Sequence, residues 1–475
     1  MFFIRPCVLV LFLTLVLSAG KYTVDDLVLS GYRNSHEIKS IKEDQKKSEA
    51  QIEKTRAGAF PVITASANAS RAIGEPYSPI STDAGSGMET EPTATQIVQG
   101  SDSPYDLALA AYLDSLVSGL SELTDIGLDK NTIEMKVKIQ QPLFAQGKVI
   151  TGLKIAKQHQ RSLLCKLHAK KAETKKKITT LFYNSLLASM NIEATREAVD
   201  IAEESRRITV ESFKTGSGNE LDTLRTGLNL EQTRSDLKEA EKGLIVANRS
   251  LIQASGVSET PESITLTGEF PEADYEVSLD TAIQKAESQN KQLLQLYATE
   301  KMMEYNVKIQ KSDFLPRVYC GASIGRTAMF DEVEDIDLEQ NSNIFAGVSI
   351  DLFKGTSRFR AVQEKKAELE SFRETKKNAS ELVEVGVRKS LEDLKTAKQD
   401  LKRFRRMVSM AEKGYRVSKS SYEQGMTTSL EMKDAENSLN KAKIGLNNAK
   451  FAYHFSVIEL KVLMGEYVEP SEYKY

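Results

Sequence analysis

The residues of this chain that could do chemistry are carboxylates that follow glycine turns. Glu431 and Asp434 lie three residues apart, six and nine residues after Gly425. On a helix, this spacing places both carboxylates on one face. Asp222 holds the position that matches Glu431, six residues after Gly216. Two interpretations stay open for these acids: a charged functional site, or solvated residues in a first helical turn, where the helix dipole favours anions.

No other group of side chains points to catalysis. The sequence offers neither a Ser/His/Asp arrangement nor a cysteine nucleophile with a partner, and Gly216-Ser-Gly218 lacks the strand and third glycine of a dinucleotide fingerprint. The histidines show no metal-ligand spacing and are expected at the surface: His36, His159, His168 and His454. We therefore expect no enzyme, no cofactor and no metal site.

Two charged groups are interpreted as solvated surfaces. An acidic run could instead bind divalent cations: Asp331, Glu332, Glu334, Asp335, Asp337 and Glu339. A basic group decorates a helix face: Lys170, Lys171, Lys175, Lys176 and Lys177. The formal net charge of −3 gives no bulk basic balance that would point to nucleic acid.

The glycine turns lie in the middle of helical hairpins. Apolar residues recur at alternating spacings of three and four on both sides of Gly425, from Leu394 to Tyr415 and from Leu439 to Leu463. A seam with a period of 3.5 residues is typical of helices that supercoil around a neighbour. The turn between them contains Gly425 and a Thr/Ser group that can cap the second helix.

The hairpin occurs twice, with an offset of 209 residues. Gly216 matches Gly425, and Gly256 matches Gly465. A segment before each hairpin repeats at an offset of 255 residues, in which Phe60-Pro61 matches Leu315-Pro316. Each proline ends a helix and starts an extended run. The chain is therefore a duplicated unit.

Each repeat also contains a pair of strands. Ile133, Met135, Val137 and Ile139 alternate with polar residues, and so do Ile344, Ala346, Val348 and Ile350 with their neighbours. This period of two indicates a half-buried sheet or a membrane barrel with lipid on one side and water on the other. The loop at 72–131 is long, with a brief helix expected at 104–120, whereas the loop at 327–342 is short. The long helices are expected at about 149–214 and 357–424, with a return helix at about 219–255.

Length and hydropathy bound the remaining possibilities. A chain of 475 residues could form two or three domains, or one elongated one. Residues 1–20 are interpreted as a signal peptide, with Arg5 before an apolar stretch and a small-residue cleavage site at Ser18-Ala19-Gly20. Beyond residue 20 there is no run of 18 apolar residues, which excludes a helical membrane protein. A disulfide between Cys165 and Cys320 is not expected.

These features together resemble the TolC-type outer-membrane efflux proteins. The resemblance rests on the signal peptide, the helix that ends in Phe-Pro, Gln141-Pro-Leu-Phe144, and Tyr422-x-x-Gly425 followed by Leu430-Glu431. It implies a mainly α fold: a trimeric α-helical barrel of coiled-coil hairpins, joined to an outer-membrane β-barrel with four strands per chain. The implied function is a channel-tunnel, an exit duct across periplasm and outer membrane for an efflux pump or type I secretion system.

The resemblance also sets the domain limits that we expect. After the signal peptide, the first repeat covers 21–256, with strands 61–71 and 132–141 and a hairpin tip near residue 216. An equatorial connector covers 257–277. The second repeat covers 278–465, with strands 317–326 and 343–352 and a tip near residue 425, and a tail follows at 466–475.

Roles for single residues follow from the resemblance alone. It implies that Asp222, Glu431, Asp434 and Tyr422 lie at the pore constriction, where rings of like charge would favour cations. Thr427 stands where relatives carry an arginine that helps to latch the closed state. Gly216, Gly218, Gly425 and Thr427 would lie at the periplasmic tip, which meets an adaptor protein and, through it, an inner-membrane pump. The alternative is a periplasmic coiled-coil adaptor or structural protein without a channel.

Overall fold

The computed structural model describes residues 21–71, 131–271, 274–330 and 336–467. The expected signal peptide, the helix expected at 104–120, nearly all of the long loop and part of the acidic run lie outside these residues. The described chain forms two units, each of which is considered by itself. One comprises residues up to 53, 151–310 and 359 onward, and the other comprises 54–150 and 311–358.

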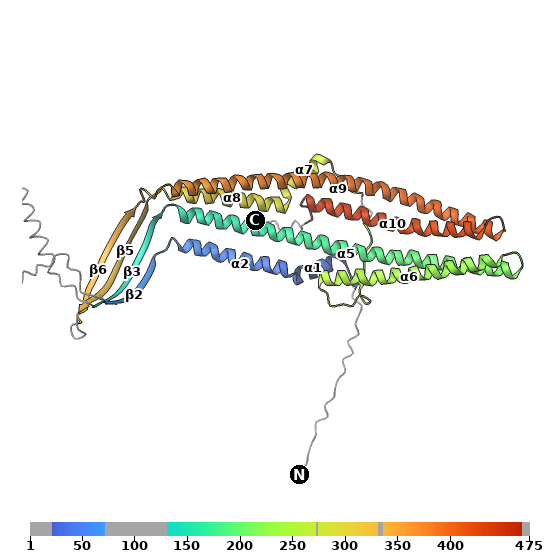
Figure 1. Cartoon of the computed structure of the whole chain (residues 1–475), viewed down its shortest axis with the longest axis horizontal. Helices are drawn as coiled ribbons and strands as arrows, with labels where there is room; N and C mark the ends of the chain where they lie inside the picture. The colour runs from blue at the N-terminus through green and yellow to red at the C-terminus, as the bar shows by residue number, and fades with distance from the viewer. Residues whose placement is uncertain (1–20, 72–130, 272–273, 331–335, 468–475) are drawn as a thin grey trace, which may run out of the picture. The chain divides into compact units, whose positions relative to one another are not determined.

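The first unit is built almost entirely of helices (Figure 1). Two short strands, β1 (Lys21–Tyr22) and β4 (Thr265–Leu266), pair in parallel. The helices of the described residues are α1 (Val24–Asn34), α2 (His36–Ala57), α5 (Lys148–Lys214), α6 (Glu220–Ser255), α7 (Leu279–Gln289), α8 (Lys291–Ser312), α9 (Ser357–Glu423) and α10 (Ser429–Leu463).

The lengths of these helices confirm the internal repeat. The two long helices α5 and α9 each have 67 residues and start 209 residues apart. The pairs α1/α7 and α2/α8 have 11 and 22 residues per helix and are offset by 255 residues. At 1.5 Å per residue, each long helix is about 100 Å in length. The duplication is thus one of backbone structure as well as of sequence.

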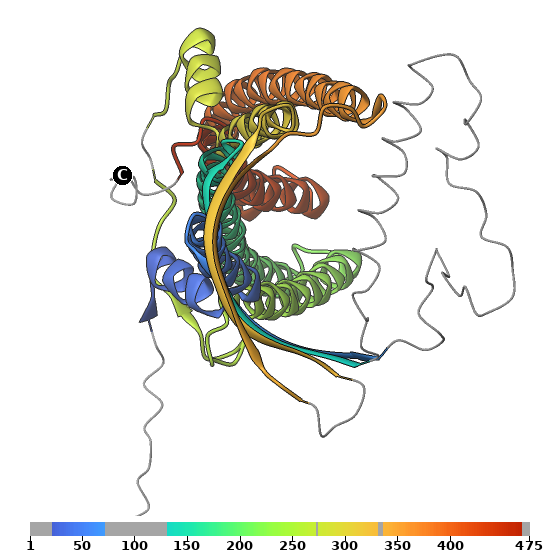
Figure 2. The same cartoon turned by 90° about the vertical axis from the view of Figure 1, so that its left-hand side faces the viewer.

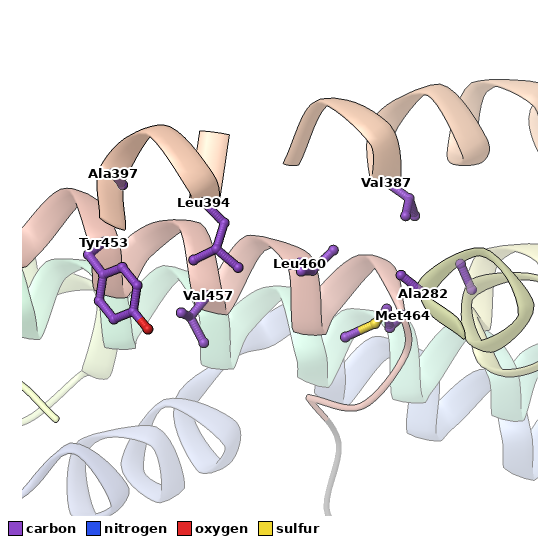
Figure 3. Packing of buried hydrophobic residues seen from close by; sticks show 9 residues of the cluster. Ala282, Val387, Leu394, Ala397, Tyr453, Val457, Leu460 and Met464 are labelled. Carbon is purple, nitrogen blue, oxygen red and sulfur yellow. The ribbon is translucent and has the colours of Figure 1, made fainter. Parts of the chain in front are cut away.

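The predicted seams form the core of the helical unit. In Figure 3, Leu394 and Ala397 of α9 face Tyr453, Val457 and Leu460 of α10, and all five are buried. A second cluster joins Leu27 of α1, Phe182 of α5 and Leu251 of α6. Burial of such side chains contributes roughly 1.5–3 kcal/mol each, which offsets the entropy of ordering long helices.

The helical segments before the two strand pairs are each divided in two. The backbone is extended at Ser35, between α1 and α2, and at Asn290, between α7 and α8. Asn290 Oδ1 accepts from the first N–H groups of α8, and its Nδ2 donates to the Leu463 carbonyl at 2.9 Å. In the first repeat, Asn34 Nδ2 donates to the Gly256 carbonyl at 2.9 Å. The interruptions therefore let polar side chains satisfy the carbonyls at the ends of α6 and α10.

The second unit is a four-stranded antiparallel sheet with the order β2-β3-β5-β6. Its strands are β2 (Val62–Arg71), β3 (Asn131–Ala145), β5 (Arg317–Phe330) and β6 (Glu339–Ser349). Figure 2 shows them side by side as a curved sheet. Three strands differ from the expected limits: β3 and β5 are longer, and β6 lies several residues earlier. The register explains β6, because Glu339 pairs with Thr327 and Ser349 with Arg317.

Candidate functional site

The two hairpin turns contain all four of the expected tip residues. Gly216 and Gly425 have φ values of 75° and 71°, the left-handed conformation that ends a helix without the penalty of a Cβ. Gly218 and Thr427 follow two residues later, at matching positions of the two turns. Apolar side chains are exposed around the turns, among them Phe213, Leu221, Leu224, Met426 and Leu430. Such a patch of exposed apolar side chains marks a surface that could contact a partner.

Glu431 closes a capping box at the start of α10. Its backbone N–H donates to Thr428 Oγ1 at 3.2 Å, and its carboxylate accepts from the Thr428 N–H at 3.0 Å and from the Thr427 hydroxyl. These hydrogen bonds, that from Thr427 first, hold the pKa of the Glu431 carboxyl below its ordinary value. Thr427 therefore holds the Glu431 carboxylate.

Asp222 makes different contacts from its counterpart Glu431. Its carboxylate accepts a hydrogen bond from the hydroxyl of Ser429, the first residue of α10, and lies 3.8 Å from Arg225 Nη1. The charge of Asp222, together with burial as the larger effect, raises the pKa of the Tyr422 phenol. The structure thus brings Asp222 and Ser429 together between the two hairpins. Asp434 is exposed one turn beyond Glu431.

Sequence reasoning missed two polar residues that join the hairpins. Asn229 of α6 donates from Nδ2 to Glu436 Oε2 of α10 at 3.3 Å, and both side chains are buried. The signal that could have revealed Glu436 is its place in the seam, three residues before Leu439. A charged residue at a seam position usually has a specific role in pairing.

The surface position expected for the histidines was wrong for His168 and His454. His168 is 4 % exposed in α5. His454 packs beside Tyr183 and Phe270, with ring centroids 4.1 and 6.2 Å away, and burial lowers its pKa to about 4. His36 and His159 are exposed, as expected. Cys165 and Cys320 are free thiols.

The sheet presents the alternation that the sequence predicted. Met135, Val137 and Ile139 of β3 are exposed, whereas Lys136 and Lys138 between them are half-buried. Lys138 Nζ lies 5.0 Å from the Phe345 ring centroid of β6. Opposite faces of β3 therefore differ in chemistry, one apolar and one charged.

Two properties of the described residues concern membranes and metal ions. Within the described ranges, no helix combines the length and the hydropathy that crossing a membrane requires. In the same part of the chain, no three side chains of His, Cys, Asp or Glu are grouped as a metal ion would need.

Comparison with known proteins places the chain in a family. The sequence model of outer membrane efflux proteins matches residues 104–257 and 282–466, more than half of the chain. The alkaline protease secretion protein AprF of Pseudomonas aeruginosa is 22% identical over 295 residues, which cover 61% of this chain and 60% of AprF. The match thus spans less than two thirds of that relative.

Solved structures share the fold over nearly the whole chain. A membrane protein from Pseudomonas aeruginosa aligns with a TM-score of 0.71 and 14% identity, covering 93% of this chain and 92% of that one. The CmeC outer membrane channel of Campylobacter jejuni aligns with a TM-score of 0.70 and 16% identity, covering 94% and 86%. With the family match in both repeats, these likenesses lead to one conclusion: the chain belongs to the outer membrane efflux protein family.

Proposed function

We propose that this chain is one subunit of a homotrimeric channel in the outer membrane that extends into the periplasm. It acts as a passive exit duct for an efflux pump or a type I secretion system, and not as an enzyme. The observation that carries the proposal is the family match in both repeats, each of which joins a strand pair to a long helical hairpin. AprF, a secretion protein by name, and CmeC, an outer membrane channel by name, support an exit duct.

The sheet supports the proposal of several subunits per channel. In hydrocarbon, an unpaired strand edge leaves backbone N–H and C=O groups without partners, so spanning sheets must close. The four strands of one chain are too few for a closed barrel, and β2 and β6 are its two edges. Three chains supply twelve strands and pair every edge. The exposed apolar residues of β3 would then face lipid, and Lys136 and Lys138 the lumen.

The turns support the proposal of an entrance that partner proteins open. Three copies of Asp222, Glu431 and Asp434 around one axis form rings of carboxylates, which favour cations and bind a multivalent blocker. Tyr422, whose phenol pKa is raised by burial and by the charge of Asp222, would help to hold the hairpins together in the resting state. The exposed apolar residues at the turns would contact a periplasmic adaptor protein and, through it, an inner-membrane pump.

Single-channel recording in planar bilayers tests this function. The wild type is expected to conduct cations in preference to anions and to be blocked by a trivalent cation from the side of the turns. The variant Glu431→Gln/Asp434→Asn should lose selectivity and block, because it removes the charges while glutamine can still complete a capping box. Glu239→Gln, at an exposed position far along α6, is the matched control.

Two outcomes would contradict parts of the proposal. Selectivity and block that survive in the double variant mean that these carboxylates do not line the constriction. Recovery of the protein in the soluble periplasmic fraction, without detergent, would eliminate the channel. That second result would instead favour the alternative of a periplasmic coiled-coil adaptor or structural protein.

A further inference from the structure

A buried carboxylate lies in the contact between the two hairpins. Glu436 of α10 is 6 % exposed. Its Oε2 accepts from Asn229 Nδ2 of α6, and the Ser205 hydroxyl of α5 is close enough to oppose the rise of the Glu436 pKa. Within the described chain, Glu436 Oε1 has no hydrogen-bond partner. An ionised carboxylate in such a place is costly, because burial removes the water that stabilises its charge.

A small cavity lies beside this carboxylate. It has a volume of about 40 Å³, and its lining includes Glu436, Asn229, Asp236, Asn440 and Lys443. Asn440 Oδ1, one helical turn from Glu436 on the same face, also lacks a partner among the described residues. Two buried acceptor oxygens thus line one small cavity, and a donor is what the site requires. A proton on Glu436 would supply one.

The charged groups of the surrounding helices leave Glu436 without a strong cationic partner. Lys443 of α10 pairs with Glu197 of α5 at 2.5 Å. On α9, Lys419 lies 3.6 Å from Glu204 of α5.

The remaining neighbours of Glu436 are acidic or phenolic, or lower its pKa by less than burial raises it. Asp236 of α6 accepts from Gln232 at 2.9 Å, and the Tyr415 phenol of α9 is close enough for the Glu436 charge to raise its pKa. Burial raises the pKa of Glu436 to about 7, against smaller opposing effects of Ser205 and Lys433.

We propose that Glu436 is a proton-binding residue that couples the two hairpins, so that its neutral form holds α10 against α5 and α6 and its ionised form loosens this contact. The contact also includes Asp222 and Ser429, because Asn229 and Glu436 each lie seven residues further along the same two helices. Residues seven apart in a seam share one line of contact. The protonation of Glu436 therefore changes the contact between the same two hairpins that carry Asp222 and Glu431.

The direction of the pH effect follows from the raised pKa. The folded chain binds the proton up to about pH 7, whereas the unfolded chain releases it near the ordinary value of 4.5. The contact is strongest at and below pH 4.5, weakens as the pH rises toward 7, and stays weak above it. If the proposed channel function holds, the entrance would open more readily above neutral pH.

Hydrogen exchange of the full-length protein tests the coupling directly and does not depend on the channel function. Wild type and Glu436→Gln are compared at the same pH, so the intrinsic chemistry of exchange cancels. At pH 4, below the ordinary pKa of Glu436, amides of α6 near Asn229 and of α10 near Glu436 should exchange equally in both proteins. At pH 8.5, the wild type should exchange about tenfold faster than the variant, whose side chain stays neutral.

Two further variants make the result decisive. Glu231→Gln removes an exposed acid of α6 that pairs with Arg234, and it should leave the pH dependence unchanged. Asn229→Asp adds a carboxylate beside Glu436 and should move the midpoint of the transition upward by about one pH unit or more. Equal exchange of wild type and Glu436→Gln at both pH values overturns the proposal. So does faster exchange of Glu436→Gln at pH 8.5, which would mean that the ionised carboxylate stabilises the contact.

Discussion

The two hairpin turns share a backbone but use their acidic residues differently. Asp222 and Glu431 are both the third residue of a helix, α6 and α10. Glu431 folds back onto its own helix start and completes a capping box with Thr428. In the first turn, Asn219 caps α6 alone, and the carboxylate of Asp222 reaches the other hairpin at Ser429. The same duplicated position therefore caps its own helix in the second repeat, where it is Glu431, and contacts the other repeat in the first, where it is Asp222.

The turns also differ two residues after the central glycine. A Cβ on Gly218 would lie 2.8 Å from the Phe213 nitrogen and 2.9 Å from the Ser212 carbonyl carbon. The N–H groups of Ser217 and Gly218 both donate to the Ser212 carbonyl, at 3.0 and 2.8 Å. The matching position in the second turn is Thr427, whose side chain donates to Glu431. Backbone hydrogen bonds close both turns, since the Met426 N–H also donates to the Ser421 carbonyl, at 2.8 Å. The first turn adds the bond from the Gly218 N–H at the position where the second turn has the Thr427 side chain.

The largest effect is expected from adding a Cβ to the closely packed first turn. Gly218→Ala should destabilise this turn by about 2 kcal/mol, because backbone atoms must move to admit the methyl group. Thr427→Ala is the matched control in the second turn and should cost less than about 1 kcal/mol. Local stability of the two turns, measured by hydrogen exchange, provides the comparison. Equal losses in both turns would mean that they are closed in the same way.

A smaller effect is expected from removing the helix caps. Thr428→Ala should cost about 1 kcal/mol of local stability at the start of α10, since the Glu431 N–H loses its partner and the reciprocal cap is broken. Asn219→Ala should cost less at the start of α6, because Asn219 caps α6 without a reciprocal bond. Hydrogen exchange in the first turn of each helix measures both losses. A larger loss in α6 than in α10 would contradict the reciprocal cap.

The smallest effect is expected from acid. Hydrogen bonds keep the pKa of Glu431 below its ordinary value of 4.5, so its contribution is complete above pH 4.5 and is lost as the pH falls through the lower folded value. Exchange at the start of α10 should therefore increase in wild type on acidification. Glu431→Gln should not show this increase, since it has no proton to gain. An acid response that persists in the variant must come from another group.

Local rules account for the parts of the fold that sequence predicted. The seams, the glycine turns and the Thr/Ser cap each depend on residues within one or two helical turns, and α9 and α10 end within two residues of the expected limits. The two-residue alternation of β3 likewise predicted which of its residues are exposed. The family resemblance, confirmed by the family match, added the function class.

The residues that sequence misplaced depend on distant partners. Ser35 and Asn290 interrupt helices that the local sequence would continue. At these interruptions, the side chains of Asn34 and Asn290 donate hydrogen bonds to the carbonyls of Gly256 and Leu463, more than 170 residues away. The sequence around His168 predicts a surface residue, but the packing of α5 buries it. None of these contacts leaves a pattern in the adjacent sequence.

Sequence by itself determined the duplication, the hairpins, the strand pairs and the family, since periodicity and turn chemistry are local properties of a chain. Only the tertiary structure decided what each polar group does. It gave Asp222 and Glu431 different partners, and it buried Glu436 against Asn229. The physical reason is that the charge state and the hydrogen bonds of a side chain depend on the water and the dipoles around it, and these are set by helices that meet only in the folded chain.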